Sequence, residues 1–200
     1  TGDLTLSDFT LTKTGGVASV SLSDISKNSQ NVWDLSLDIS SGFADGSENL
    51  IINPASTSSI YDWAGNYALT NQSNNSVNLN PAPTLSGFDI SSNNTRTSGT
   101  MARSGDTVTL NFTANQTIDK PTVTFKSGGD LIIDTDSLSY VSNDEKINWS
   151  FSYDVSGDTE GLVSYEITDL VSTTGIVGKD VSGSTSVTVD LTSPYGESIY

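Results

Sequence analysis

Apolar and polar residues alternate along most of this chain with a period of two. This pattern predicts β-strands that place one face on a core and the other in water. The alternating segments are residues 9–11, 18–22, 33–39 and 77–79 in the first part of the chain, and 107–113, 123–125, 147–155, 163–167 and 187–191 in the second; residues 50–52 are a compact apolar run that Asn53-Pro54 ends. Short strands separated by Gly, Asn, Asp and Ser turns, without a helical period, indicate an all-β sandwich architecture.

The polar run at residues 71–80 ends in Pro81-Ala82-Pro83, where the strand pattern is interrupted. Each side of this point has about the length of one β-sandwich. We therefore expect two tandem domains, residues 1–82 and 83–194, with residues 195–200 as the start of a linker or of a following repeat. Because proline fixes φ, the proline-containing linker is expected to restrict bending between them.

The longest alternation in the chain, at residues 147–155, has Trp149 near its middle. We expect Trp149 to lie on the inward face and to fill the core of the second domain. Each large apolar side chain buried on such a strand contributes roughly 1.5–3 kcal/mol. Since the chain has no cysteine, the core must be stable without disulfides.

The acidic balance of the chain argues against two classes of partner. The formal net charge is −16, from 24 acidic and 8 basic residues, and both halves are acidic. Nucleic acid is disfavoured because its binding depends mainly on Lys and Arg contacts to phosphate. Anionic membrane surfaces are disfavoured for the same reason, and no apolar run approaches the roughly 20 residues that span a bilayer. We therefore expect no nucleic-acid partner and no direct membrane insertion.

The residue types needed for common catalytic chemistry are missing. There is no histidine and no cysteine, so the usual bases that activate a nucleophile are absent, together with the commonest transition-metal ligands. The Gly-x-Ser-x-Gly signature of serine hydrolases does not occur either. Acidic residues are so frequent that no single pair of carboxylates stands out as a glycosidase site. We predict that the chain is not an enzyme and requires no cofactor.

Calcium is the one metal that the abundant oxygen ligands favour, because it takes six to eight oxygens from carboxylates, amides and carbonyls. The candidate ligands are Asp45 with Glu48, Asp62 with Asn66, and the cluster of Asp130, Asp134 and Asp136. None of these groups has the EF-hand spacing. The alternative is that they are loop acids that set turns, with Asp62 and Asn66 forming side-chain-to-backbone bonds in a β-turn.

Three aromatic residues, Tyr61, Trp63 and Tyr67, lie close together in the sequence before the linker. Such side chains can form a stacking platform for sugars, which makes them candidate ligand-binding residues. The role that we favour for them is packing between the two domains, since aromatic side chains also dominate interfaces, and the sugar platform is its alternative.

Several segments resemble the immunoglobulin-like and cadherin-like repeats of large bacterial surface proteins and adhesins. In the first domain they are SDFTL at 7–11, DGSENL at 45–50, SIYD at 59–62 with AGN at 64–66, and NNSVNLN at 74–80. In the second they are SGDTVTL at 104–110, PTVTF at 121–125, WSFSY at 149–153 and SVTVDLTSP at 186–194. The resemblance implies two tandem immunoglobulin-like β-sandwiches at the surface of a bacterial cell or outside it.

The chain departs from this family pattern at two places. In such repeats a further strand usually precedes the Asp-Phe segment, so the first domain is expected to lack its first strand or to be completed by a neighbour. The second domain has no Ala-Gly-Asn turn, and residues 169–175 stand in its place.

The resemblance implies non-catalytic structural repeats that space or present a binding tip, with neighbouring repeats of the same chain as partners and calcium as a stiffening ion. Two alternatives belong to other classes. One is a carbohydrate-binding or adhesive module that contacts a glycan or a surface protein directly, and the other is a repeat of a surface-layer protein.

Overall fold

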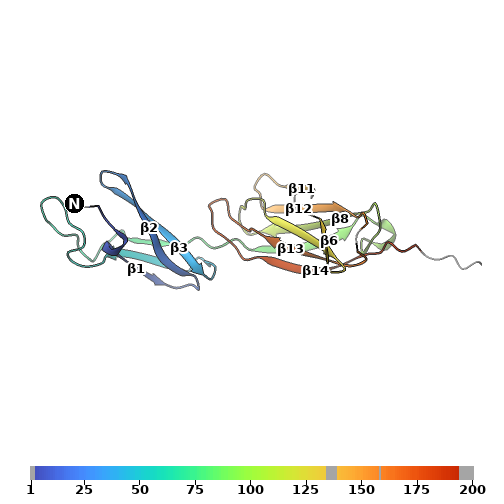
Figure 1. Ribbon diagram of the computed structural model, residues 1–200, viewed down its shortest axis with the longest axis horizontal. Coiled ribbons are helices and arrows are strands. Elements are labelled where there is room, and N and C mark those ends of the chain that lie inside the picture. Colours follow the sequence, from blue (N-terminus) through green and yellow to red (C-terminus); the bar gives the residue numbers. More distant parts are fainter. Residues whose placement is uncertain (1–2, 134–138, 158, 194–200) are drawn as a thin grey trace, which may run out of the picture. The chain divides into compact units, whose positions relative to one another are not determined.

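The computed structural model describes residues 3–133, 139–157 and 159–193 of the chain. The chain divides into two compact units, Thr1–Ala82 and Pro83–Tyr200. Every strand pairing in the described residues joins two strands of the same unit (Figure 1). The independent folding of each unit stays a prediction.

The first unit consists of two small antiparallel sheets. Its elements are η1 (Leu6–Asp8), β1 (Phe9–Thr14), β2 (Ser19–Ser29), β3 (Val32–Ser41), β4 (Asn49–Pro54) and β5 (Ser76–Asn78). One sheet has the order β1-β4-β5, with Leu11 opposite Ile52, and the other is the long hairpin of β2 and β3. The sheet order of an immunoglobulin domain is not present in the described part of this unit, so that classification stays a prediction for it.

The first unit buries little apolar surface. Trp33, Leu35 and Leu37 share one face of β3, as the alternation predicts, but all three are only half-buried. Ile39 continues this row on the same face but is 37% exposed. Leu50 of β4 is the one large apolar side chain that is fully buried in the described part of this unit. The two sheets therefore enclose a thin core.

The last strand of the first unit is shorter than the sequence predicts. β5 ends at Asn78, and Val77 in its middle is 54% exposed. Leu79, expected in this strand, lies beyond it and donates its backbone N–H to the carbonyl of Glu48.

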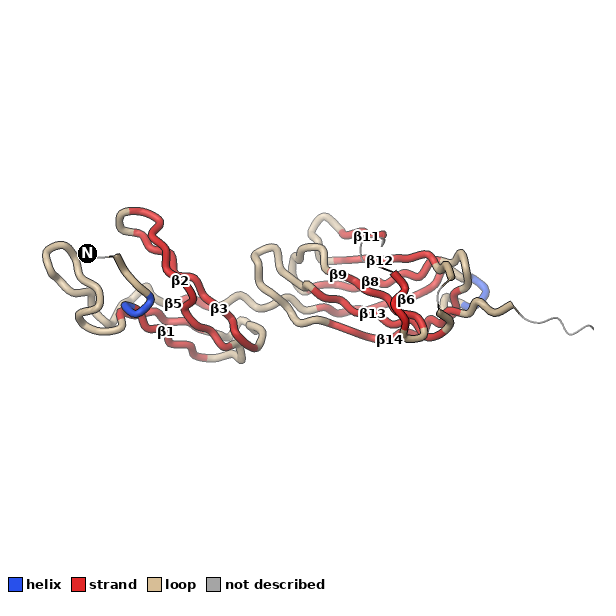
Figure 2. Tube along the Cα trace, viewed as in Figure 1, coloured by secondary structure: helices blue, strands red, loops and turns tan. Residues whose placement is uncertain are grey.

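The second unit is a two-sheet sandwich (Figure 2). Its elements are β6 (Leu85–Ser92), η2 (Thr95–Thr97), β7 (Met101–Ala102), β8 (Thr107–Ala114), β9 (Thr122–Ser127), β10 (Asp130–Ile133), β11 (Ser139–Ser142), β12 (Asn148–Asp154), β13 (Gly161–Thr168) and β14 (Val181–Val189). One sheet has the order β11-β12-β8-β6, and the other has the order β10-β9-β13-β14-β7.

This sheet order is that of an immunoglobulin domain. In such domains strands A, B, E and D form one sheet, and C, F and G form the other. Strands β6, β8, β12 and β11 occupy the first four positions, and β9, β13 and β14 occupy the other three. The short β7 pairs in parallel with β14 at the edge of the second sheet. The second unit is therefore an immunoglobulin-like sandwich.

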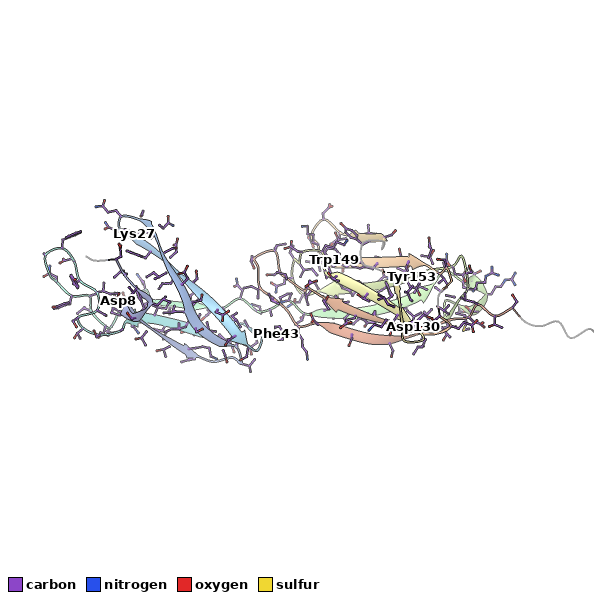
Figure 3. All side chains as sticks on the ribbon, viewed as in Figure 1. Asp8, Lys27, Phe43, Asp130, Trp149 and Tyr153 are labelled. Atoms are coloured by element: carbon purple, nitrogen blue, oxygen red, sulfur yellow. The ribbon has the colours of Figure 1, made fainter. Side chains whose placement is uncertain are left out.

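The core of the second unit follows directly from the alternation in its strands. In β8 and β9 every second residue is buried, including Leu110, Phe112 and Phe125. β12, the neighbour of β8 in the same sheet, contributes Trp149, Phe151 and Tyr153, two of which are labelled in Figure 3. The rings of Phe112 and Phe151 stack with centroids 5.8 Å apart, and those of Phe125 and Tyr153 lie 5.0 Å apart.

Trp149 is buried as predicted, with 4% of its surface exposed, but it is not the equivalent of the central tryptophan of an immunoglobulin domain. That residue belongs to strand C, and strand C is β9 here, where Phe125 is fully buried. Trp149 instead lies on β12 in the other sheet. Its indole N–H donates to the Lys146 carbonyl at 3.1 Å, and its ring stacks on Tyr140 of β11.

In each unit the chain enters and leaves at opposite ends. In the first unit the chain enters at Phe9, which pairs with Pro54 at the end of β4. It leaves through the segment after β5, which lies beyond the start of β4. There the Ala82 N–H donates to the Ala44 carbonyl at 2.7 Å. In the second unit Leu85 pairs with Ala114 at the end of β8. The leaving strand β14 ends beside Ala102, which one turn separates from the start of β8.

Within residues 3–133, 139–157 and 159–193 no helix has the length and hydropathy needed to cross a bilayer.

Candidate functional site

The most exposed aromatic side chains of the first unit lie on one loop, residues 55–75, which joins β4 to β5 and is called the aromatic loop below. Tyr61 and Tyr67 form an isolated antiparallel bridge, and their rings meet edge to face with centroids 6.3 Å apart. Trp63 lies between them in the sequence and is 88% exposed. Three predicted ligand-binding residues are therefore brought together, with an indole that projects into solvent.

Asp62 fixes the shape of this loop. One carboxylate oxygen accepts the backbone N–H of Ala64 at 2.9 Å and that of Asn66 at 2.8 Å, and the other accepts the Asn66 side-chain amide at 2.9 Å. Gly65 completes the turn with a φ of +88°, a conformation that glycine adopts at little cost. The Asn66 side chain, followed by its backbone N–H, lowers the pKa of the Asp62 carboxyl.

The geometry at Asp62 and Asn66 agrees with the alternative prediction for these residues, a β-turn held by side-chain-to-backbone hydrogen bonds. Both carboxylate oxygens already accept N–H groups, so a calcium ion would have to compete with them. Calcium at this turn stays a prediction.

The second predicted metal pair, Asp45 and Glu48, lies in the segment between β3 and β4. Glu48 has no exposed surface. Its carboxylate accepts the backbone N–H of Ala18 at 3.2 Å, that of Asp45 at 3.1 Å and that of Gly46 at 3.2 Å. The carboxylate thus joins the turn after β1 to the segment before β4, a structural role for a buried charge that backbone donors satisfy.

Burial raises the pKa of the Glu48 carboxyl, but the backbone N–H donors, including those of Ala18 and Asp45, outweigh it and hold the pKa below its ordinary value. Asp45 accepts both the hydroxyl and the backbone N–H of Ser47, and these bonds lower its pKa. Gly16 makes room for Glu48, because a Cβ at Gly16 would lie 2.0 Å from a Glu48 carboxylate oxygen. Only a residue without a side chain fits there.

The two predicted metal pairs do not form one site. Glu48 immediately precedes β4 and the aromatic loop follows it, so the length of the strand, roughly 20 Å for six residues, lies between them. Within the described residues no group of three or more Asp or Glu side chains is placed to hold a metal ion. Of the third predicted cluster, Asp130 accepts the Thr159 hydroxyl at 2.8 Å, and Asp134 and Asp136 lie outside the described residues.

The aromatic loop does not lie where the chain leaves the first unit. It follows the Pro54 end of β4, whereas the leaving segment is hydrogen-bonded to Ala44 and Glu48 before the other end of that strand. β5 carries the chain back along β4 before it reaches Pro81. Packing of Tyr61, Trp63 and Tyr67 between the two domains stays a prediction.

Two features of these sites were missed in the sequence. Leu69 is 74% exposed and adds to the apolar surface of the aromatic loop. Its signal is a large apolar residue shortly before the polar run at residues 71–80. The burial of Glu48 depends on Gly16 and Ala18, about thirty residues earlier, and no local pattern reveals it.

No family model and no curated protein matches the chain. Among solved structures, the trigonal form of titin M4 is similar to 57% of this chain and 99% of its own, with 15% identical residues and a TM-score of 0.31. A likeness this weak carries no argument, and the immunoglobulin-like fold of the second unit rests on its own sheet order. The more specific resemblance to bacterial surface repeats stays a prediction.

Proposed function

We propose that the chain is a non-catalytic spacer, composed of tandem repeats of a bacterial surface protein or adhesin that is exposed outside the cell. The observation that supports this role best is that the chain enters and leaves each unit at opposite ends. Units of this kind lengthen an array when they are joined in series, with neighbouring repeats as their partners. A stiffening calcium ion remains part of the proposal.

The pairing of β7 with β14 supports a load-bearing role for the second unit. The two strands are parallel, and the backbone hydrogen bonds at this pairing include those from the Thr188 N–H to the Thr100 carbonyl at 3.0 Å and from the Asp190 N–H to the Ala102 carbonyl at 2.9 Å. β7 belongs to the entering part of the chain and β14 to the leaving part. A pull on the two ends would slide these strands past each other and load both bonds together.

The linker is held firmly on both sides of the unit boundary. Ala82 is 5% exposed and bonded to Ala44 in the first unit. In the second unit the Thr84 N–H donates to the Asn115 side chain at 2.8 Å, and the Asn115 N–H donates back to the Thr84 carbonyl at 3.0 Å. Only Pro83 stands between these anchored residues, and its φ is fixed by its ring. These bonds support the proposal of a stiff joint.

Single-molecule pulling on the full chain tests this function. We expect separate unfolding events for the two units, with the second adding roughly 3.5 Å of contour length per unfolded residue. Thr188→Pro, which removes one of the donors that bond β14 to β7, should lower the unfolding force of the second unit. Thr124→Pro is the matched control, since Thr124 lies on β9 in the same sheet. Equal forces for both variants would contradict the shear geometry.

The exposed aromatic loop favours a second candidate function, direct contact with a glycan. Trp63 offers an almost fully exposed indole beside the paired rings of Tyr61 and Tyr67. Sugars stack on such surfaces through their apolar faces. If the loop binds a glycan, Trp63→Ala should abolish binding on a glycan array, whereas Val17→Ala, at another exposed apolar position of the same unit, should leave it intact. Binding that survives Trp63→Ala would exclude this site.

A further inference from the structure

A shallow groove on the outer face of one sheet of the second unit is lined by polar groups without charge. The groove has a volume of about 330 Å³ and lies over β8 and β12, between Val141 of β11 and Gly87 of β6. Small-molecule sites have volumes of roughly 300–1,000 Å³, so the groove can receive a small ligand.

Two local features make this face hollow. On β6 the register with β8 shifts between Ser86 and Asp89, and Gly87 in this bulge has a φ of +64° and no side chain. The floor consists of the short side chains of Asn111 and Ser150, which are paired across β8 and β12. Val141 pairs with Ser150 on the other side and is 68% exposed, so it forms an apolar wall.

The amide groups around the floor are held in place by the protein. The side-chain oxygen of Asn143 accepts the backbone N–H of Ile147 at 2.9 Å and that of Asn148 at 3.0 Å. The side-chain oxygen of Asn148 accepts the Thr113 hydroxyl at 3.0 Å. These bonds use the oxygens and leave the NH₂ groups of Asn143 and Asn148 as donors for a ligand.

Asn111, in the centre of the floor, adds both a donor and an acceptor. Its side chain makes no hydrogen bond to any part of the chain that the structure describes, and it lies on the outer face because Leu110 and Phe112 on either side are buried. The groove therefore offers three amides and the Ser150 hydroxyl at its surface.

The absence of charge decides the class of ligand. None of the residues that line the groove is Asp, Glu, Lys or Arg, although the chain carries a net charge of −16. An ionic ligand would lose hydration without gaining a partner of opposite charge among the lining residues. Asp89, which pairs with Asn111 across β6 and β8, is next to the floor but does not line the groove. Amides and hydroxyls complement hydroxyl groups, and Val141 offers an apolar contact for C–H groups. A sugar ring has both kinds of surface.

We propose that this groove binds a sugar unit of a neutral glycan, with Asn111 and Asn148 hydrogen-bonded to its hydroxyl groups and Val141 against its C–H face. This site lies in the second unit, and it depends neither on the spacer function nor on the aromatic loop.

The test is a titration of the isotope-labelled full chain with maltotriose, cellotriose and chitotriose, followed by NMR. We expect at least one of these neutral sugars to shift the side-chain NH₂ signals of Asn111 and Asn148. Asn111→Ala should weaken binding by roughly 2–10-fold, the effect of one neutral hydrogen bond. Ser150→Phe, which fills the floor, should abolish it.

Ser152→Phe is the matched control, because Ser152 lies two residues along β12 on the same outer face and does not line the groove. It should bind sugar as the natural sequence does. The proposal is overturned if none of the three sugars shifts the groove amides, or if Ser150→Phe binds as well as Ser152→Phe. Binding lost in Trp63→Ala and kept in Ser150→Phe would assign the sugar to the aromatic loop and also overturn it.

Discussion

Replacing Trp149 with alanine should destabilise the second unit selectively. Trp149 is 4% exposed and packs against Phe151 and Tyr140, so truncation leaves a cavity near the start of β12. Truncation of a buried tryptophan costs about 3–5 kcal/mol. The hydrogen bond from the indole to Lys146 adds little to this cost, because the Lys146 carbonyl also accepts the Ile118 N–H at 3.2 Å. Against a total stability of about 5–15 kcal/mol, the loss is large.

Urea denaturation measures this effect unit by unit. With a slope of about 1.5 kcal/mol per molar, a loss of 4 kcal/mol lowers the midpoint of the second unit by roughly 2–3 M. In Trp149→Ala the remaining tryptophans, Trp33 and Trp63, both lie in the first unit, so their fluorescence reports that unit alone. Circular dichroism follows both units.

Leu131→Ala is a suitable control, because Leu131 is 63% exposed and its truncation should cost less than about 0.5 kcal/mol. Two results would contradict this prediction. One is an unchanged midpoint for the second unit in Trp149→Ala, and the other is an equal shift of the Trp33 and Trp63 signal, which would mean that the two units unfold as one.

Three further predictions concern the first unit and the linker. Gly16→Ala should lower the melting temperature of the first unit, because the new Cβ would collide with the Glu48 carboxylate and because the φ of Gly16 is +55°. Gly65→Ala should lower it less, since Gly65 also has a positive φ but has open space around it. Equal decreases in melting temperature for the two variants would contradict this. The lowered pKa of Glu48 stabilises the folded first unit above the ordinary pKa of a glutamate, and this stabilisation is lost as the pH falls through the lower pKa of the folded state. Glu48→Gln should therefore make the melting temperature of the first unit less sensitive to acid. An unchanged dependence of the melting temperature on pH would show that Glu48 is not the responsible group. Replacing Pro81 and Pro83 with glycine should broaden the distribution of distances between the two units that solution scattering measures. Identical scattering of the variant and the natural sequence would argue against a stiff joint.

The sequence predicted the strands that are buried on one face for their whole length. β8, β9, β12 and β13 each keep a strict alternation because one side packs on the core and the other meets water. β6 was missed because the bulge at Gly87 shifts its register and breaks the pattern. β10 and β11 were missed because they are short edge strands of four residues each, for which only one neighbour constrains the pattern.

The candidate sites show the same limit. The turn at Asp62 and Asn66 was predictable, because its hydrogen bonds join residues no more than four apart. The structural role of Glu48 and the groove over Asn111 could not be predicted, because both depend on residues from distant segments that the sheets bring together. In the first unit the half-buried row on β3 had the expected period, but period alone does not tell how much surface an opposing sheet covers.

The most direct test of the spacer function is the distance between the two ends of the chain. Since the chain has no cysteine, the double variant Thr10→Cys and Ser193→Cys allows one spin label to be attached near each end. Pulsed electron–electron double resonance then measures the distance between the two labels. Two units that each pass the chain from one end to the other, at roughly 3.4 Å per strand residue, predict a single narrow distribution centred at about 50 Å or more. A broad distribution, or one centred below about 30 Å, would show that the chain folds back on itself and would contradict the proposed function.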